Sequence, residues 1–464
     1  MLGLLGIILS LAGLIYFAYR GYSVLFLAPL MALVAVVFSG VLSAELFGTY
    51  TQIFMQGLGR YLIQFFPIFL LGAIFGKVMA DSGAAETIAR TVVDRLGAAR
   101  AIAAVVLSCA ILTYGGVSLF VVAFAVFPIA VSLFRAADIP RRLIPAAIAL
   151  GSFTFTMTAL PGTPAIQNAI PSAFFGTDTF AAPGLGLIAA AMMLFGGLFW
   201  LQRRAAAAKA AGEGYGPAGP TDGELVPERA LPSFALAILP IITVIGLNYL
   251  LSKVIFPGTD LSFLAEKRFG EVSPSAVTGL WALIGALTAA IALALITQRR
   301  YLSDIRTSLN EGTMGSLLPI FNTASEVAYG AVIASLAGFL VVRDAVVGIA
   351  PGNPLISLSV AINTLAGITG SASGGLSIAL DTLGSTYLER AQAIGISPEL
   401  LHRVATISSG GFDVLPHNGA VVTLLAITGL THAKSYLDIF VVAAIIPVIA
   451  LITVIVLGST LGTF

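Results

Sequence analysis

The chain has 464 residues, of which 58% are hydrophobic and only 10% are charged, and its mean hydropathy is +1.01. A water-soluble domain of this composition would expose a large apolar surface, so the composition excludes a soluble globular protein and favours a membrane protein. The net charge of +1 gives no sign of nucleic-acid binding, and the single cysteine, Cys109, excludes a disulfide framework or a cysteine-based metal site.

Apolar stretches of about 20 residues, the length that crosses the hydrocarbon core of a bilayer, recur along the whole chain. The first, residues 2–18, lacks a basic leader and a small-residue cleavage site, so we interpret it as a retained helix. We therefore predict an all-α polytopic membrane protein, located in the cell inner membrane.

Short matches recur in the same order in the two halves of the chain, as expected for a transporter built from two repeats. The matching pairs are residues 67–69 with 319–321, residues 112–116 with 368–371, and residues 159–163 with 414–418. A stretch rich in Ala, Gly, Pro and charge separates the halves. We predict an N-terminal transmembrane repeat at 1–201, a cytoplasmic linker at 202–231 and a C-terminal inverted repeat at 232–464.

The distribution of basic residues predicts that the repeats are inverted. We assign to the cytoplasm residue 20, residues 77–100, residues 135–142, the linker, residues 299–306 and residue 434. The cytoplasmic side then holds 16 of the 23 Lys and Arg residues, and the other side holds 7. Both termini are then external. This arrangement requires residues 101–134 and 355–387 each to enter and leave on one side, as re-entrant hairpins or broken helix pairs.

Four polar, glycine-rich interruptions of the apolar segments, one pair in each half, predict the substrate site. Irregular backbone at membrane depth is tolerated where protein or a water-filled cavity satisfies its polar groups. Half-helices that begin there direct free N–H groups at an anion, so a carboxylate could bind without an arginine, and the interruptions contain none. Close helix packing is the alternative for any single glycine pair. The candidate substrate-binding residues are Gly115, Gly116, Ser118, Gly162, Thr163, Asn168, Ser371, Ser373, Gly374, Gly375 and Asn418.

Ionisable residues inside apolar segments are candidates for ion coupling, because a buried charge is costly unless it is paired or neutralised. Asp413 and His417 lie four residues apart and could form a proton relay, or Asp413 could cap a half-helix while His417 binds a carbonyl. Glu326 and Asp381 are further candidates, unless each is solvated near an interface. His402 falls in a loop-like stretch and is expected to be structural or solvated.

Two long runs resemble the gluconate permease (GntP) family of proton symporters. Residues 71–90 resemble that family's N-terminal half, and residues 409–421, continued by 428–432 and 438–442, resemble its C-terminal signature. The resemblance implies an ion-coupled transporter with scaffold and transport subdomains, re-entrant hairpins, a homodimer and an elevator-type motion.

Departures from the family pattern bear on the substrate. In family members that carry sugar acids, the segment matching residues 116–128 has an acidic residue, where this chain has only Ser118, and the first proline motif has a histidine in place of Thr163. Fewer polar groups suit a less hydroxylated ligand. We expect a short hydroxy or keto monocarboxylate, such as 3-hydroxybutyrate, carried with a proton or sodium ion and without a cofactor.

Other functions remain as alternatives or are disfavoured. Gluconate or another sugar acid is one alternative substrate, and sodium/proton antiport without an organic substrate is an alternative activity. An enzyme is disfavoured, because the zinc-protease motif His-Glu-x-x-His and the hydrolase motif Gly-x-Ser-x-Gly are both absent. The expected partners are a small organic anion and the lipid bilayer.

Overall fold

The computed structural model describes residues 2–20, 22–40, 43–217, 230–416 and 418–464, and every regular element in these ranges is a helix. A helix satisfies its backbone N–H and C=O groups within one segment, which is why an apolar chain in lipid adopts it. The predicted all-α fold class is confirmed.

The helices of the first half are α1 (Leu2–Tyr19), α2 (Val24–Phe38), α3 (Glu45–Gly48), α4 (Met55–Asp81), α5 (Ala84–Leu96), α6 (Ala101–Tyr114), α7 (Leu119–Ala136), α8 (Ile144–Ser152), α9 (Phe155–Thr158), α10 (Ile166–Phe175) and α11 (Pro183–Ala210). Those of the second half are α12 (Phe234–Leu250), α13 (Pro274–Thr297), α14 (Ile305–Ser335), α15 (Phe339–Val347), α16 (Pro354–Thr369), α17 (Ala372–Ala393), α18 (Pro398–Ser409), α19 (Gly419–Thr428), α20 (His432–Phe440) and α21 (Ile446–Leu461).

Short π-helical or 3₁₀ segments join or extend these helices. The π-helical segments are η1 (Thr49–Phe54), η4 (Leu251–Ile255) and η10 (Val441–Ile445). The 3₁₀ segments are η2 (Ala98–Arg100), η3 (Arg141–Leu143), η5 (Phe256–Gly258), η6 (Ser262–Ala265), η7 (Lys267–Phe269), η8 (Arg299–Tyr301) and η9 (Phe412–Val414).

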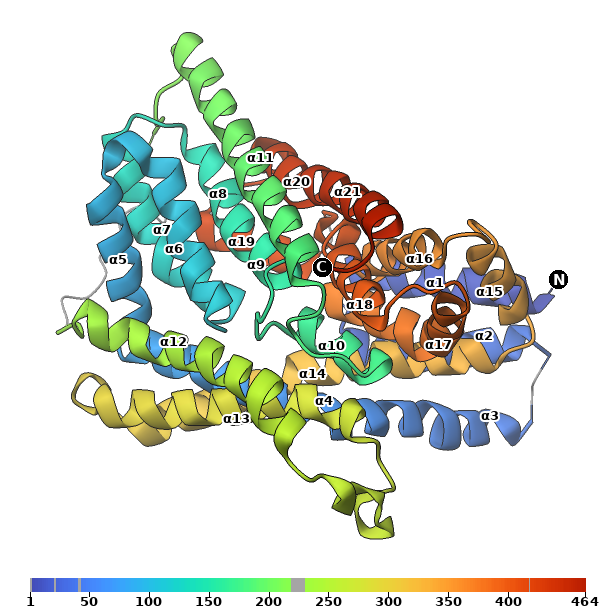
Figure 1. Cartoon of the computed structure of the whole chain (residues 1–464). Helices are drawn as coiled ribbons and strands as arrows, with labels where there is room; N and C mark the ends of the chain where they lie inside the picture. Colours follow the sequence, from blue (N-terminus) through green and yellow to red (C-terminus); the bar gives the residue numbers. More distant parts are fainter. Residues whose placement is uncertain (1, 21, 41–42, 218–229, 417) are drawn as a thin grey trace.

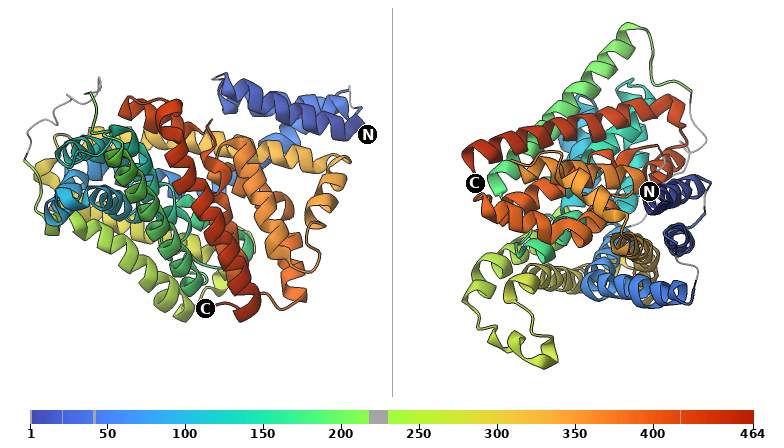
Figure 2. Two further views of the ribbon diagram at one scale, coloured as in Figure 1. Left: turned by 90° about the horizontal axis from the view of Figure 1, so that it is seen from above. Right: turned by 90° about the vertical axis from the view of Figure 1, so that its right-hand side faces the viewer.

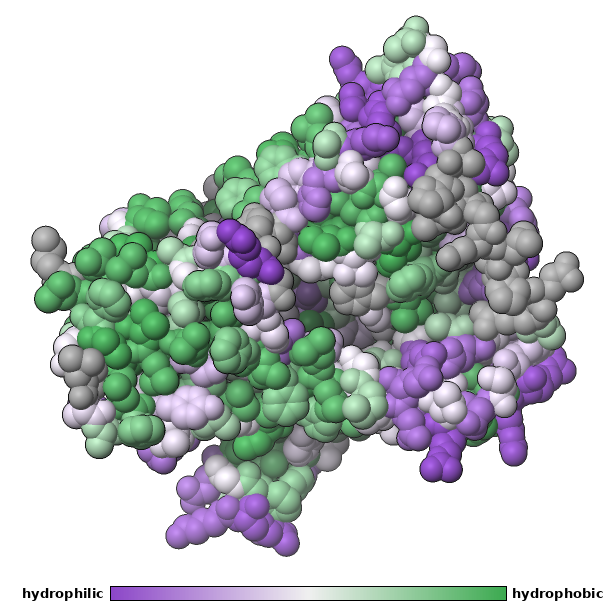
Figure 3. Space-filling model, turned by 180° about the vertical axis from the view of Figure 1, so that it is seen from behind, coloured by the Kyte–Doolittle hydropathy of each residue, from purple (hydrophilic) through white to green (hydrophobic). Residues whose placement is uncertain are grey.

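Within the described ranges, six helical stretches are long and apolar enough to cross a membrane: Glu45–Asp81, Pro183–Ala210, Phe234–Gly258, Pro274–Thr297, Ile305–Ser335 and His432–Leu461. A seventh span results if α5 and the helix that follows it, which meet at an angle of 102°, are counted together. The face drawn in Figure 3 carries a broad apolar area, and its hydrophilic residues gather toward one end and at two projections. These features are those of a multi-pass membrane protein.

The long helices α4 and α14 pack side by side and run in opposite directions (Figure 1). The start of α14 lies at the end of α4, where the Ser308 hydroxyl donates to Asp81 Oδ2 at 2.6 Å. Near the start of α4, a Cβ on Gly57 would stand 3.2 Å from the Cα of Ala328, which is toward the end of α14. The two helices carry the matching Pro67 and Pro319, so the halves are inverted as predicted.

The remaining helices follow the same order in both halves and make reciprocal contacts. The pair α1 and α2 corresponds to α12 and α13, and α2 packs on α14 as α13 packs on α4. Figure 2 shows α1 and α2 as a pair at one edge of the molecule, beside α14. Likewise α10 of the first half contacts α17, and α19 of the second half contacts α7. We call α1, α2, α4, α12, α13 and α14 the scaffold and the helices α6–α11 and α16–α21 the transport subdomain.

Each half of the transport subdomain contains one hairpin and one broken helix. Helices α6 and α7 pack against each other across the break at residues 115–118, and α16 and α17 do so across residues 370–371. The broken helices are α8 to α10, interrupted around Pro161, and α18 to α19, interrupted from Gly410 to Asn418. The four predicted interruptions are therefore present as hairpin tips and helix breaks.

Helix α11 continues through residues 202–210 and so extends into the predicted linker. Residues 218–229 of that linker lie outside the described residues. The repeat boundaries at 201 and 232, and the side of the membrane on which each end lies, remain predictions.

Candidate substrate and ion site

Ser371 and Asn418 shape the tip of the second-half hairpin. Gly370 ends α16 with a φ of 62°, a left-handed conformation that glycine adopts without strain. Ser371 Oγ accepts a hydrogen bond from the Gly374 amide at 3.0 Å and so caps α17. Asn418 caps α19 by accepting from the Val421 amide at 2.9 Å, and its Nδ2 donates to the Gly370 carbonyl at 2.8 Å. The second hairpin and the second broken helix are thus joined at their polar ends.

Tyr114 joins the first-half hairpin to the first broken helix. Its hydroxyl donates to the Pro161 carbonyl at 2.7 Å. Gly116 turns the chain with a φ of 93°, and Ser118 follows as the residue before α7, without capping that helix through its side chain. Hairpin tip and break are therefore in contact in this half too, although the tie comes from the hairpin rather than from the broken helix.

Close packing accounts for three of the predicted glycines. A methyl group added to each would collide with a neighbour: Gly115 with Ile241, Gly162 with Phe180, and Gly375 with the backbone of Ala366. These positions follow the packing alternative, in which a small residue allows close approach.

Asn168 serves the protein's own backbone in this structure. It is fully buried, and its Nδ2 donates to the carbonyls of Thr163 at 3.1 Å and Thr179 at 2.8 Å. Its Oδ1 accepts a hydrogen bond from Arg403 at 3.3 Å and lies 3.2 Å from His402 Nε2. All polar atoms of the Asn168 side chain are engaged, so it anchors the first break.

Arg403 on α18 is a buried cation at the first break, and sequence reasoning missed it. Its side chain is fully buried. The guanidinium donates to the carbonyls of Ala181 at 2.7 and 3.0 Å, Ala159 at 3.2 Å, and Thr158 and Thr179 at 3.4 Å. Neutral carbonyls therefore replace the water that would otherwise solvate this guanidinium.

The expectation that His402 lies in a loop-like stretch is wrong. It is fully buried in α18, and its Nδ1 lies 2.6 Å from the Thr177 hydroxyl. Its structural role holds, since both ring nitrogens contact the first-half break or the turn after α10.

The two broken helices meet inside the transport subdomain. A Cβ on Gly410, at the end of α18, would stand 2.8 Å from Cγ2 of Thr158 in α9. Both Arg403 and Asn168 lie beside this crossing, because Arg403 binds the Thr158 carbonyl and Asn168. The crossing brings the breaks of both halves together, as a central site requires.

Glu326 of α14 lies against the hairpin tip of the second half. The residue is 5% exposed, and a Cβ on Gly374 would overlap its Oε2 and stand 2.8 Å from its carboxyl carbon. The Ser371 hydroxyl, which caps α17, is also beside this carboxyl group. The Oε2 atom makes no hydrogen bond to any described residue. A scaffold carboxyl group therefore occupies the N-terminal turn of α17.

Further hydroxyl groups surround this carboxyl. Thr323 Oγ1 of α14 lies 3.5 Å from Ser373 Oγ of the hairpin. The buried hydroxyl of Tyr61 on α4 lies near Ser377 and Glu326, without a hydrogen bond. We call the following residues the Glu326 cluster: Tyr61, Thr323, Glu326, Ser371, Ser373, Gly374 and Ser377.

Asp381 is outside the Glu326 cluster. It is exposed on α17, one turn beyond Ser377, and the charge that acts on it is that of Arg60 on α4. Its predicted role in ion coupling is not supported by proximity to the other candidates.

Asp413 is buried at the second break, in η9. Its Oδ1 has no hydrogen-bond partner in the described part of the chain, and it does not cap α19, whose cap is Asn418. Its predicted partner His417 lies outside the described residues, so the pair stays a prediction. The nearby Gly411 is required by packing, since a methyl group there would overlap Oδ1 of Asn363.

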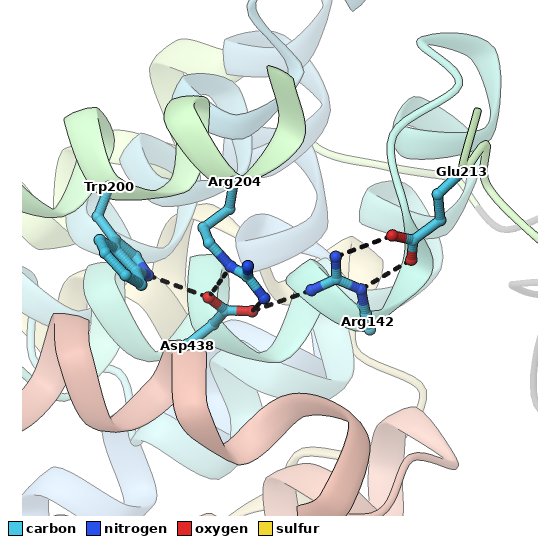
Figure 4. A network of polar contacts seen from close by, with 5 residues as sticks. All are labelled: Arg142, Trp200, Arg204, Glu213 and Asp438. Carbon is cyan, nitrogen blue, oxygen red and sulfur yellow. Dashed lines mark hydrogen bonds and ion pairs between the residues drawn. The ribbon is translucent and has the colours of Figure 1, made fainter. Parts of the chain in front are cut away.

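An ionic network outside the Glu326 cluster, which the sequence did not reveal, joins the two halves (Figure 4). Asp438 of α20 is 1% exposed and accepts hydrogen bonds from Arg204 at 2.7 Å, Trp200 at 3.0 Å and Arg142 at 3.2 Å. Arg142 also binds Glu213 through two hydrogen bonds of 2.7 and 2.9 Å. We call these five residues the Asp438 cluster.

The ion pair between Arg142 and Glu213, at the outer side of the Asp438 cluster, shifts the pKa of both residues. The hydrogen bond from Arg142 lowers the pKa of Glu213 below its usual value of 4.5, against a smaller opposing effect of burial. The same hydrogen bond raises the pKa of Arg142. Both residues are therefore charged at neutral pH and hold the segment after α11 against η3. Among the described residues, no three His, Cys, Asp or Glu side chains come together as a metal site would require.

Comparison with known proteins places this architecture among transporters. The model of the GntP family permeases matches residues 2–459. The transporter YxjC of Bacillus subtilis (strain 168) is 45% identical over 463 residues, which cover 96% of this chain and 98% of that one. A transporter of Haemophilus influenzae (strain ATCC 51907 / DSM 11121 / KW20 / Rd) is 32% identical over 129 residues, which cover 27% of this chain and 29% of that one.

The fold is also similar to a solved structure. The crystal structure of the YdaH transporter of Alcanivorax borkumensis, described as having an unusual topology, superposes with a TM-score of 0.55. The match covers 91% of this chain and 90% of that one at 16% identity, so the likeness concerns the fold alone. The family match and the YxjC relative each extend over nearly the whole chain. The chain is a membrane transporter that belongs to the GntP family of permeases.

Proposed function

We propose that this permease is a proton-coupled symporter of a short hydroxy or keto monocarboxylate, such as 3-hydroxybutyrate, in the cell inner membrane. The observation that carries the proposal is the contact between Glu326 and the α17 N-terminus. It combines a buried carboxyl group that can take up a proton with a helix end that can hold a carboxylate. Proton and anion together are neutral, which lowers the cost of moving the occupied site through the membrane.

The polar groups at the hairpin tip support a small, sparsely hydroxylated substrate. Ser371, Ser373 and Thr323 offer hydroxyl groups, and Asn418 is already engaged by the hairpin and its own helix. A sugar acid has many hydroxyl groups, and each one buried without a partner would weaken binding. A short acid with one hydroxyl or keto group needs fewer partners.

The division into a scaffold and a transport subdomain supports an elevator-type motion, in which hairpins and broken helices move together past α4 and α14. The contact between α14 and α17 lies on the boundary that such a motion would change. A homodimer with its scaffold at the interface, both termini external and the linker cytoplasmic completes the proposal.

The test is uptake of labelled 3-hydroxybutyrate into proteoliposomes. We expect saturable uptake that rises with an inward proton gradient, with gluconate competing weakly, and that falls to passive exchange when an ionophore collapses the gradient. Equal uptake with and without the gradient would rule out proton coupling. Uptake that depends on a sodium gradient would mean that sodium, and not the proton, is the coupling ion. Sodium/proton exchange without uptake of any acid would favour the antiporter.

A further inference from the structure

The N-terminal turn of α17 is the part of the hairpin best suited to bind a carboxylate, yet the protein's own carboxyl group occupies it. The positive end of the helix dipole and the Ser371 hydroxyl are directed at this position. Gly374 leaves just enough room there for Glu326, because any side chain at 374 would overlap Oε2. A substrate carboxylate cannot take this position while Glu326 is there.

The Glu326 cluster is not fully hydrogen-bonded in this arrangement. Three buried oxygen atoms of the cluster lack a hydrogen-bond partner in the described part of the chain: Tyr61 Oη, Glu326 Oε2 and Ser377 Oγ. Each of these residues is at most 5% exposed. Buried oxygens in native proteins are normally paired, so unpaired groups at one place indicate a site that binds something else in another state.

No neighbouring cation neutralises Glu326 in the described part of the chain. The titratable group that faces it is Tyr61, and Tyr329, one turn further along α14, is bonded to Ser10. Helix α2 has no ionisable side chain. The charged residues of the other helices packed on α14 lie at least partly exposed or near the ends of the helices: Arg60, Lys77 and Asp81 on α4, Arg343 and Asp344 on α15, and Asp381, Glu389 and Arg390 on α17.

We propose that Glu326 is a built-in competitor of the substrate, and this inference rests on the proposed symport function. In the empty transporter the ionised Glu326 carboxylate occupies the N-terminal turn of α17. When Glu326 takes up a proton from the outer solution, it loses the attraction of the helix end and leaves. The substrate carboxylate then takes its place beside Ser371 and the Gly374 amide.

Competition for one position gives coupling without direct contact between proton and substrate. The anion binds only when Glu326 is protonated, and each anion therefore enters with one proton. When the anion leaves on the inner side, the vacant helix end attracts Glu326 again, and its proton is released into that solution. One proton is thus carried for each monocarboxylate.

The first test measures the affinity of the purified protein for 3-hydroxybutyrate between pH 5 and pH 8 by isothermal titration calorimetry. On the alkaline side of the range, the wild-type dissociation constant should rise about tenfold per pH unit, because one proton must bind with each anion. Glu326→Gln, which has the shape but not the charge, should bind with a constant that changes less than about twofold over the whole range.

Two further variants serve as matched comparisons. Glu311→Gln makes the same chemical change on the same helix, at a residue that is exposed and pairs with Lys77, and should keep the wild-type pH dependence. Glu326→Asp keeps a titratable group on a shorter side chain. Its affinity for the substrate should still depend on pH, but the carboxylate should compete more weakly. In proteoliposomes, Glu326→Gln should exchange labelled for unlabelled 3-hydroxybutyrate but lose accumulation driven by the proton gradient.

The outcomes separate this inference from the function on which it rests. A wild-type affinity that does not change with pH, together with uptake that the proton gradient still drives, would overturn the competition and leave symport standing. Gradient-driven accumulation by Glu326→Gln at the wild-type level would overturn it as well. Failure of the wild type to bind or transport any of the acids would instead contradict the proposed function.

Discussion

At position 403 a guanidinium group is fully buried and donates hydrogen bonds to four backbone carbonyls and to Asn168. The planar fork of an arginine can serve several acceptors in different directions, whereas a lysine ammonium has three donors at one point. The carbonyls around Thr158 and Ala181 belong to interrupted backbone, which would otherwise be unsatisfied at membrane depth. Arg403 therefore stabilises the first break from the second half of the chain.

Replacing Arg403 by lysine should destabilise the protein in spite of the retained charge. Lost hydrogen bonds to a charged donor cost roughly 1.5–3 kcal/mol each, so we expect a loss of about 3 kcal/mol or more. The melting temperature of the detergent-solubilised protein would show it. The same substitution at the exposed Arg268 should leave that temperature unchanged; equal effects at both positions would contradict a role specific to the break.

At the scale of elements, each hairpin is tied to the broken helix of its own half by one side-chain hydrogen bond. The second-half bond runs from Asn418 to the Gly370 carbonyl, and the first-half bond from Tyr114 to the Pro161 carbonyl. The ties act on irregular backbone, at the helix break in the first half and at the hairpin tip in the second, so they set the distance between the helix ends that would face a substrate.

Removal of the Tyr114 hydroxyl in Tyr114→Phe should impair transport more than folding. A neutral hydrogen bond contributes about 1 kcal/mol, which corresponds to roughly a fivefold loss of apparent affinity if the tie positions the site. Concentration-dependent uptake into proteoliposomes measures this change. Tyr249→Phe, at an exposed position, is the control. Wild-type kinetics for Tyr114→Phe would mean that the tie has no role in positioning.

Substitutions in the Asp438 cluster should affect stability rather than transport, because its central carboxylate is buried between cations from the other half. Asp438→Asn leaves Arg204 and Arg142 without their counter-charge and should cost about 3 kcal/mol of stability. Glu213→Gln, at the half-exposed outer side of the cluster, should cost at most about 1 kcal/mol. Thermal unfolding of both variants beside the wild type would show the difference.

The Glu213 contribution should also depend on pH. Its folded-state pKa lies below the usual 4.5, so the stability it provides is present above that value and is lost as the pH falls through the folded-state pKa. The melting temperatures of the wild type and Glu213→Gln should therefore converge in acid. A difference that grows in acid would have the wrong sign for this ion pair.

At the scale of the whole molecule, two kinds of helix contact can be told apart. Helices α4 and α14 pack within the scaffold, where Gly57 lies against Ala328 and Ala331. Helix α14 also packs on α17 of the transport subdomain, where Gly330 lies against Ile378. If the transport subdomain moves, the second contact changes during each cycle and the first does not.

Disulfide cross-linking distinguishes these contacts. In a Cys109→Ala background, which has no other cysteine, Gly330→Cys with Ile378→Cys should form a bridge that abolishes uptake until it is reduced. Gly57→Cys with Ala331→Cys, whose Cβ atoms would be 3.3 Å apart, should bridge within the scaffold and leave uptake intact. Full activity of the first bridged variant would exclude relative motion of α14 and α17.

Local signals predicted the architecture, but long-range partners decided the roles of individual residues. Offsets between prolines and glycine-rich breaks predicted the two repeats, because turns and interruptions depend on nearby residues, and the distribution of basic residues predicted that the repeats are inverted. Asn168 was predicted as a ligand for its place at a break, yet its partners are backbone groups and α18 side chains. Arg142 and Asp438 are 296 positions apart, and no periodicity indicates such a pair.

The antiparallel packing of α4 and α14 also bears on the reaction cycle as a whole. Each half carries its own hairpin and broken helix, so the molecule contains two copies of one helix arrangement, inverted relative to each other in the membrane. The hairpin is tied by Tyr114 in the first half and by Asn418 in the second, and Glu326 of the scaffold lies against the tip of the second-half hairpin. The two hairpins are therefore not equivalent, and the resting transporter should favour one orientation over the other even when the solutions on both sides are identical.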